Sequence, residues 1–123
     1  MSQRPHKNLE VWKESIQLVK MIYRLCVNLP DDEKYGLKSQ LKRASVSVAA
    51  NIAEGAGRQS DKELLQFLSI ASGSLSEIDT LFEIIVELEL IDSKNMNEII
   101  NQINKVTALL NGLRKAIHLK INH

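Results

Sequence analysis

The sequence predicts an all-α protein in which four antiparallel helices pack up-down-up-down into a single bundle. Three observations lead to this fold class. Apolar residues recur at three- and four-residue steps over four long segments, as they do on the buried face of a helix. The two prolines, Pro5 and Pro30, lie outside these segments, and no window alternates as a strand would. The 123 residues are enough to bury one core without metals or disulfides.

The N-terminal third is expected to hold a short arm and the first helix. Residues 1–8 are predicted to be a flexible arm, and the bundle is predicted over residues 9–120. The first helix is placed at about residues 9–29 and ends at Pro30. Its expected seam is one apolar stripe, which a second stripe widens. The seam comprises Leu9, Trp12, Ile16, Val19, Tyr23 and Cys26, and the second stripe comprises Val11, Leu18, Ile22, Leu25 and Leu29.

The second helix is predicted over about residues 34–56 and carries three different faces. Its core stripe contains Leu37, Leu41, Ala44, Val48 and Ile52. The segment from Gly55 to Gly57 is expected to end the helix with a glycine in the left-handed conformation. A polar line flanked by apolar and by small residues predicts contact with more than one neighbour.

The third helix is predicted over about residues 61–90 and the fourth over about residues 93–119. Ser60 and Glu63 have the spacing of a capping box for the third helix, and Asp92 or Ser93 is expected to cap the fourth. The core stripe of the third helix is Leu64, Leu68, Ala71, Leu75, Ile78, Phe82 and Ile85. That of the fourth is Met96, Ile99, Ile103, Val106, Leu110, Leu113 and Ile117.

Surplus apolar surface and uneven charge predict a homo-oligomer. Leu65, Ile70, Ile84 and Leu88 lie off the main stripe of the third helix, and large apolar patches rarely stay exposed. Residues 1–58 carry ten Lys/Arg and six Asp/Glu, whereas residues 61–90 carry Lys62 and seven acids. Segments of opposite net charge are expected to pair within or between subunits.

A polar stripe on the second helix is the sharpest candidate site. It is defined by Gln40, Arg43, Ser47, Asn51, Glu54 and Arg58, which share one side at helical spacing. Glu54 and Arg58 can pair along the helix, and an amide such as Asn51 among apolar neighbours can fix register or oligomeric state. The stripe is interpreted as a polar seam between helices or subunits, with a ligand or partner pocket as the alternative.

A basic line on the same helix is the candidate nucleic-acid surface. Lys34, Lys38 and Lys42 follow one another at four-residue spacing, and Arg4 and Lys7 are available from the arm. Contacts of lysine and arginine with phosphates give binding to RNA or DNA that depends on salt and not on sequence. The alternative is an ordinary solvated helix face.

No catalytic, metal or cofactor site is predicted. The line Asp79, Glu83 and Glu87 lacks the Glu-x-x-His partners of a bundle metal site, and the histidines lie near the chain ends. No combination of nucleophile and base can be assembled, so the protein is not expected to be an enzyme. The lone Cys26, the early charges and the short uncharged runs predict a soluble cytoplasmic protein without a membrane span.

Several short motifs resemble the four-helix-bundle proteins encoded in intervening sequences of bacterial 23S ribosomal RNA genes. The similarity covers about residues 8–117. It includes residues 9–12 (LEVW), 35–41 (YGLKSQL), 51–58 (NIAEGAGR), 60–63 (SDKE), 73–77 (GSLSE) and 110–113 (LNGL). This chain has Ala49 where many relatives have proline and Ala56 where they have an aromatic residue.

The resemblance implies a homopentamer of four-helix subunits arranged as a ring. Similar proteins are accessory factors of diversity-generating retroelements, where they bind nucleic acid and a reverse transcriptase, and they are more basic than this chain. The resulting expectation is a non-enzymatic pentameric scaffold that contacts RNA or DNA through the second helix. The alternative is a structural or protein-interaction oligomer that docks a protein partner, such as a reverse transcriptase, without binding nucleic acid itself.

Overall fold

The computed structural model describes residues 4–33 and 36–122, and all regular secondary structure in this part of the chain is helical. The predicted all-α class with four long helices is therefore confirmed. The α-helices are α1 (Glu10–Val27), α2 (Leu37–Ala56), α3 (Asp61–Glu87) and α4 (Asn97–Ile121). Three short 3-10 turns, η1 (Pro5–Asn8), η2 (Asp31–Glu33) and η3 (Ser93–Met96), lie at the ends of the helices.

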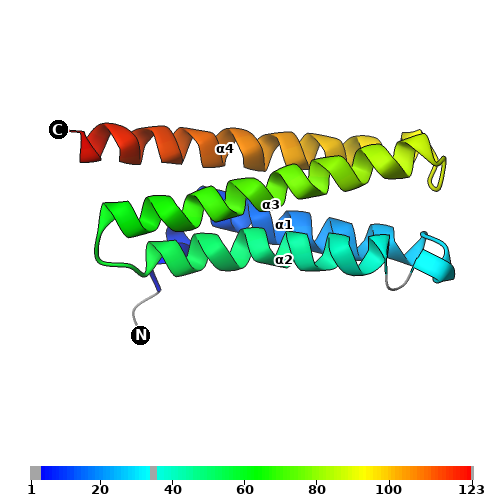
Figure 1. The fold of residues 1–123 in the computed structure, drawn as a ribbon, viewed down its shortest axis with the longest axis horizontal. Coiled ribbons are helices and arrows are strands. Elements are labelled where there is room, and N and C mark those ends of the chain that lie inside the picture. The colour runs from blue at the N-terminus through cyan, green and yellow to red at the C-terminus, as the bar shows by residue number, and fades with distance from the viewer. Residues whose placement is uncertain (1–3, 34–35, 123) are drawn as a thin grey trace.

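The four helices lie side by side, and consecutive helices run in opposite directions (Figure 1). α1 packs on α2 and α4, and α3 packs on the same two helices. α1 and α3 therefore occupy opposite corners of the bundle, and both border α2. The pair formed by α2 and α3 is the most extensive contact.

The core is one continuous aliphatic cluster along the bundle axis. The expected stripes of α2, α3 and α4 fill it, and Leu41, Ile52, Leu68, Ile78 and Ile85 are completely buried. Each such side chain contributes about 1.5–3 kcal/mol on transfer from water. This burial aligns the four helices and determines which faces remain outside.

The α1 helix uses the stripe that the sequence analysis treated as secondary. Leu18, Ile22 and Leu25 from that stripe lie in the core, whereas Trp12, Ile16 and Val19 from the expected seam are only half-buried. Both stripes are apolar, so periodicity alone could not decide which faces inward. The consequence is an apolar side of α1 that is left at the surface beside α2.

The prediction that a glycine in the left-handed conformation ends α2 is wrong. Gly57 caps α2 with φ −85° and ψ −4°, which is a right-handed conformation open to any residue. The left-handed residue lies after α3 instead, where Glu89 has φ 53°. The Glu89 N–H binds the Val86 carbonyl at 3.0 Å and the Leu90 N–H binds the Ile85 carbonyl at 3.1 Å, which together make a Schellman motif.

Gly55 allows α2 and α3 to approach closely. A Cβ atom at this position would lie 2.9 Å from Phe67 Cβ and 3.1 Å from Leu64 Cδ1. A larger residue therefore needs the two helices to move apart. At the adjoining turn, the Glu63 N–H binds Ser60 Oγ at 3.1 Å, so the expected N-cap of α3 is present.

The N-terminal arm and the start of α4 differ from expectation. Pro5–Asn8 were expected to belong to a flexible arm. They form a 3-10 turn that packs against α1 and α2, and Pro5 favours this turn because its ring fixes a helical φ angle. The His6 ring packs edge-on against Trp12, with ring centroids 4.9 Å apart. Asp92 accepts a hydrogen bond from the Lys94 N–H at 3.1 Å and caps η3, and α4 proper begins only at Asn97.

Candidate functional site

An apolar groove between α1 and α2 is the clearest surface feature. It has a volume of about 310 Å³ and is closed at one end by His6. Its walls are almost wholly apolar, with small side chains on α2 facing larger ones on α1. The groove is lined by Trp12, Ile16 and Val19 from α1 and by Val46, Ala49, Ala50 and Ala53 from α2. The α1 residues were predicted to lie in a core seam, and no groove between them and α2 was predicted.

The lysines predicted as a nucleic-acid surface are largely engaged within the subunit. The Lys38 side chain is only 15% exposed, and its Nζ lies 3.5 Å from Asp31 Oδ1. The Lys42 Nζ lies 5.0 Å from the centroid of the Tyr23 ring, in a cation–π contact with α1. Lys34 lies outside the described residues. Lys42 thus links α2 to α1, and Lys38 links the first turn of α2 to η2.

The basic residues of the arm do not join this lysine line. Arg4 and Lys7 are exposed beside η1, where α1 begins and α2 ends. Lys38 lies in the first turn of α2, at the other end of the bundle. The 18 residues of α1 separate the two groups by about 27 Å at 1.5 Å per residue. A single nucleic-acid duplex or strand would have to run along the whole bundle to contact both the arm residues and the lysine line.

The polar stripe runs along the contact between α2 and α3. Its central hydroxyl, Ser47 Oγ, lies 2.9 Å from Ser74 Oγ across the two helices. Asn51 Nδ2 donates to the Ser47 carbonyl oxygen at 2.8 Å and to Ser47 Oγ at 3.1 Å. Arg43 Nη2 lies 3.5 Å from Glu77 Oε2 on α3. Ser47 and Arg43 thus make polar contacts between two helices of one subunit, whereas Asn51 bonds within α2.

The outer members of the polar stripe lie in solvent or at the end of α2. Gln40 is exposed, and the Glu54 and Arg58 side chains pair at 3.5 Å with both partly exposed. The Arg58 guanidinium also lies 4.8 Å from the centroid of the Phe67 ring. A surface ion pair of this kind contributes about 0–1 kcal/mol. The stripe therefore offers hydrogen bonds between helices and no enclosed site.

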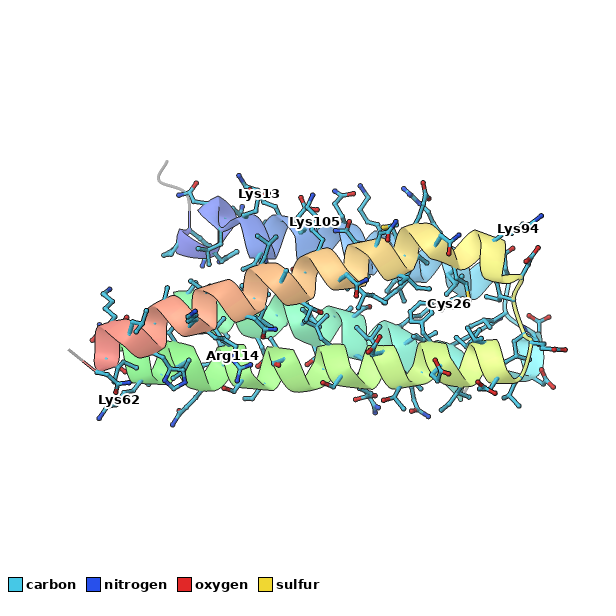
Figure 2. All side chains as sticks on the ribbon, turned by 90° about the horizontal axis from the view of Figure 1, so that it is seen from above. Lys13, Cys26, Lys62, Lys94, Lys105 and Arg114 are labelled. Atoms are coloured by element: carbon cyan, nitrogen blue, oxygen red, sulfur yellow. The ribbon has the colours of Figure 1, made fainter. Side chains whose placement is uncertain are left out.

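Two polar contacts between α4 and its neighbours were missed by the sequence analysis. Gln102 Nε2 donates to the carbonyl and to Oε1 of Glu14 at 2.8 and 2.9 Å, and Lys105 Nζ lies 3.3 Å from the same carboxylate. The hydrogen bond from Gln102 and the charge of Lys105 hold the pKa of Glu14 below its ordinary value. On the other side, Arg114 Nη1 donates to Ser72 Oγ at 3.2 Å. Figure 2 shows Lys105 and Arg114 on α4.

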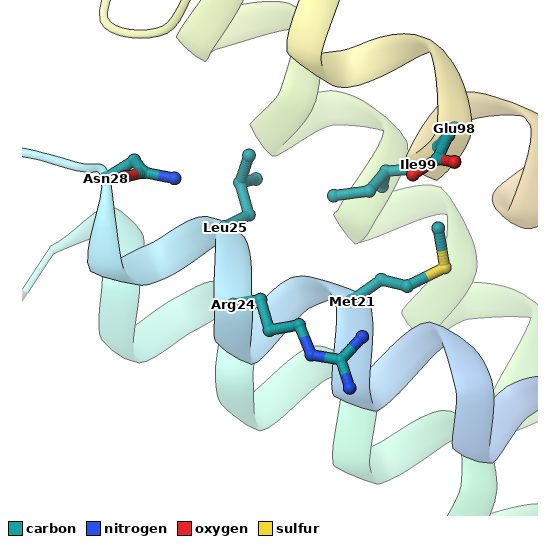
Figure 3. A pocket seen from close by; sticks show the side chains of 6 residues that line it. All are labelled: Met21, Arg24, Leu25, Asn28, Glu98 and Ile99. Atoms are coloured by element: carbon teal, nitrogen blue, oxygen red, sulfur yellow. The ribbon is translucent and has the colours of Figure 1, made fainter.

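A second, smaller pocket lies between α1 and α4. It has a volume of about 180 Å³ and an apolar floor that includes Leu25 and Ile99, which point toward each other in Figure 3. Arg24 and Glu98 stand at its edge on opposite helices. Pockets for small-molecule ligands usually measure 300–1,000 Å³, so this one is too small for such a ligand.

The described residues contain no group of three or more His, Cys, Asp or Glu placed to hold a metal ion. Burial raises the pKa of the Cys26 thiol, so it is not activated as a nucleophile. In the described part of the chain, no helix combines the length and apolar character needed to cross a membrane.

By its fold and surface, the chain is a small four-helix-bundle protein with an apolar groove beside α2. The sequence model of the family described as 23S rRNA-intervening sequence protein matches residues 7–112. The chain therefore belongs to this family, and the resemblance found in its motifs is confirmed.

A solved structure supports the same fold. The chain is similar to a crystal structure from Bacteroides thetaiotaomicron VPI-5482, a protein with unknown function from the S23 ribosomal protein family. The TM-score is 0.79 at 25% sequence identity, and the match covers 85% of this chain and 98% of the other. A comparison with curated proteins found no significant match.

Proposed function

We propose that the protein is a non-enzymatic homopentameric scaffold whose subunits join through the α1/α2 groove. The observation that carries this proposal is the groove itself, which leaves Trp12, Ile16 and Val19 half-buried beside a row of small α2 residues. Burying such surface against another copy is favourable by about 25 cal/mol per Å². Small residues such as Ala50 also let a neighbouring helix approach α2 closely.

A charged α2 variant tests this assembly. Val46 and Ala50 are exposed at the groove, and we expect Val46→Glu with Ala50→Glu to leave the subunit folded while preventing association. Light scattering should give five times the 13.9 kDa chain mass for the wild type and one chain mass for the variant. The matched control places Ile100→Glu and Leu119→Glu on α4, away from the groove. A variant that keeps the wild-type mass contradicts assembly through the groove.

Contact with RNA or DNA through the α2 lysines is the second part of the proposed function. Lys38 and Lys42 each carry a positive charge, but their contacts with Asp31 and Tyr23 must loosen before either reaches a phosphate. A ring would repeat these lysines in every subunit and so add avidity. Arg4 and Lys7 remain exposed at the other end of each subunit.

Salt-dependent binding to mixed-sequence RNA tests this contact. Replacing Lys38 and Lys42 by alanine should weaken binding equally for all sequences and lower the salt slope by about 1 for each lost phosphate contact. The control replaces Lys115 and Lys94, two exposed lysines of the α4 region, by alanine. An unchanged affinity in the Lys38/Lys42 variant removes these residues from the nucleic-acid surface.

Docking of a protein partner without nucleic-acid binding is the alternative that the side-chain contacts favour. Lys38 and Lys42 are engaged within the subunit, and the net charge of the chain is only +1. A partner such as a reverse transcriptase would then bind the assembled scaffold. This alternative predicts no retention on a polyanion column at physiological salt, whereas nucleic-acid binding predicts retention that fails as salt rises.

A further inference from the structure

Two apolar strips remain exposed outside the core, one on α1 and one on α3. The α1 strip consists of Trp12, Ile16, Val19, Tyr23 and Val27, and Val27 is 81% exposed. The α3 strip consists of Ile70, Ile84 and Leu88, of which Ile70 is 51% and Leu88 is 59% exposed. The spacing of each set keeps it on one side of its helix. The α1 strip is continuous along its helix, and Ile84 and Leu88 form an exposed apolar pair one turn apart at the end of α3, with Ile70 further back on the same side.

The two strips lie on neighbouring faces of the bundle that meet along α2. The α1 strip borders α2, because three of its residues line the groove with Val46 and the alanines of α2. The α3 strip also borders α2. Glu77 lies seven residues after Ile70 and seven before Ile84, and it pairs with Arg43 of α2. Residues seven apart share a helix face, so Ile70 and Ile84 lie on the same side as Glu77.

The strips have charged edges of opposite sign. Lys20 and Arg24 each follow a residue of the α1 strip, and Figure 2 shows Lys13 on the same helix, so the edge away from α2 is basic. Glu83 and Glu87 each precede a residue of the α3 strip and so lie about 100° around the helix from it, which makes the side of α3 away from α2 acidic. All five side chains are exposed, and none pairs with another residue in the described parts of the chain.

We infer that the α3 strip of one copy docks on the α1 strip of the next copy. This inference rests on the proposed oligomer and specifies its interface. The occupant is a second copy of this chain, because the α3 strip supplies both the apolar side chains for the α1 strip and the acids that match its basic edge. Two different surfaces meet in this contact, which makes it heterologous and not self-complementary.

The positions of the strips favour a closed ring over a filament. Contacts on opposite faces would extend the assembly in a straight line, whereas contacts on neighbouring faces turn each copy relative to the last. α1 and α3 run in the same direction, and their charged edges lie on opposite sides of the strips. Rotating a copy about an axis parallel to the helices therefore brings the acidic edge against the basic edge. The same rotation brings the α2 helices of the two copies together at their small residues, such as Ala50.

A complementation experiment tests the contact with two variants that each lose one strip. The α1 variant carries Tyr23→Glu and Val27→Glu, and the α3 variant carries Ile84→Glu and Leu88→Glu. All four positions are exposed in the subunit, so folding should persist, and circular dichroism checks it. The control is again Ile100→Glu with Leu119→Glu on α4, which should assemble as the wild type does.

Light scattering on the separate and mixed variants gives distinct outcomes. Each variant alone should have the mass of one 13.9 kDa chain, and an equal mixture should form dimers, because one intact α1 strip meets one intact α3 strip. Misfolded variants could not restore each other in this way. A mixture that stays monomeric overturns the inference.

The remaining outcomes separate this inference from the proposed function. If the α1 variant dissociates while the α3 variant keeps the wild-type mass, a surface other than the α3 strip occupies the groove, and the inference fails while assembly through the groove stands. If both variants and the Val46/Ala50 variant all keep the wild-type mass, the inference and assembly through the groove fail together. A monomeric wild type has the same consequence for both.

Discussion

Glu89 shows how one residue ends the longest helix under strain. Its φ of 53° is left-handed, a conformation that costs a non-glycine residue about 1–2 kcal/mol. Glycine adopts it freely but loses more chain entropy on folding. We therefore expect Glu89→Gly to raise the free energy of unfolding by about 0.5–1 kcal/mol, as measured by urea denaturation.

The control for this prediction is glycine inside the same helix. Asp79→Gly lies on an exposed turn of α3 with ordinary helical geometry and should lower the free energy of unfolding by about 1 kcal/mol. Equal losses in the two variants would mean that Glu89 is not strained in solution.

The lysine line illustrates what a sequence can and cannot say about single side chains. Four-residue spacing correctly places Lys38 and Lys42 on one side of α2. It carries no information about the neighbouring helix, which places Tyr23 beneath Lys42, nor about η2, which supplies Asp31 to Lys38. The charge of a residue can be read from the sequence, but its accessibility depends on residues distant in the chain.

At the scale of elements, the contact between α2 and α3 depends on Gly55. Alanine is the better helix former by about 1 kcal/mol, yet its Cβ would lie 2.9 Å from Phe67 Cβ. Because overpacking costs about 1–3 kcal/mol and the gain in helix propensity offsets about 1 kcal/mol of it, we expect Gly55→Ala to lower the free energy of unfolding by up to about 2 kcal/mol. Thermal and urea denaturation measure this change.

Gly112 provides the matched control within α4. Nothing lies within 4 Å of a Cβ built there, so Gly112→Ala should gain helix propensity without a clash. Stabilisation by both substitutions would show that α2 and α3 can separate freely at Gly55 and would refute close packing as the role of this glycine.

The helices themselves were predictable because their periodic apolar stripes are long and their breaks are marked by Pro30 and Ser60. The choice of inner face on α1 was not, since two adjacent stripes are apolar and only packing against α2 and α4 selects one. The left-handed residue was also misplaced, because glycine permits that conformation without requiring it, and Glu89 adopts it under the Schellman hydrogen bonds. Tertiary contacts decided the first case, and local backbone hydrogen bonds at the helix end decided the second.

At the scale of the molecule, the faces of the bundle differ in polarity and in how fully they are covered. The contact between α2 and α3 is closed by polar side chains such as Ser47 and Ser74, whereas the face between α1 and α2 is left apolar and open. Uneven charge places bases beside one exposed strip and acids beside the other. This difference between the faces is the basis of the proposed assembly of the subunit with copies of itself.

The central claim is that this surface forms a closed ring of five subunits. Sedimentation velocity on the wild-type protein over a wide concentration range tests it directly. We expect one species of five times 13.9 kDa. Its mass should not increase with concentration, because a closed ring leaves no α1 or α3 strip free to bind further copies. A monomer at every concentration, or a series of species that grows as concentration rises, would contradict it.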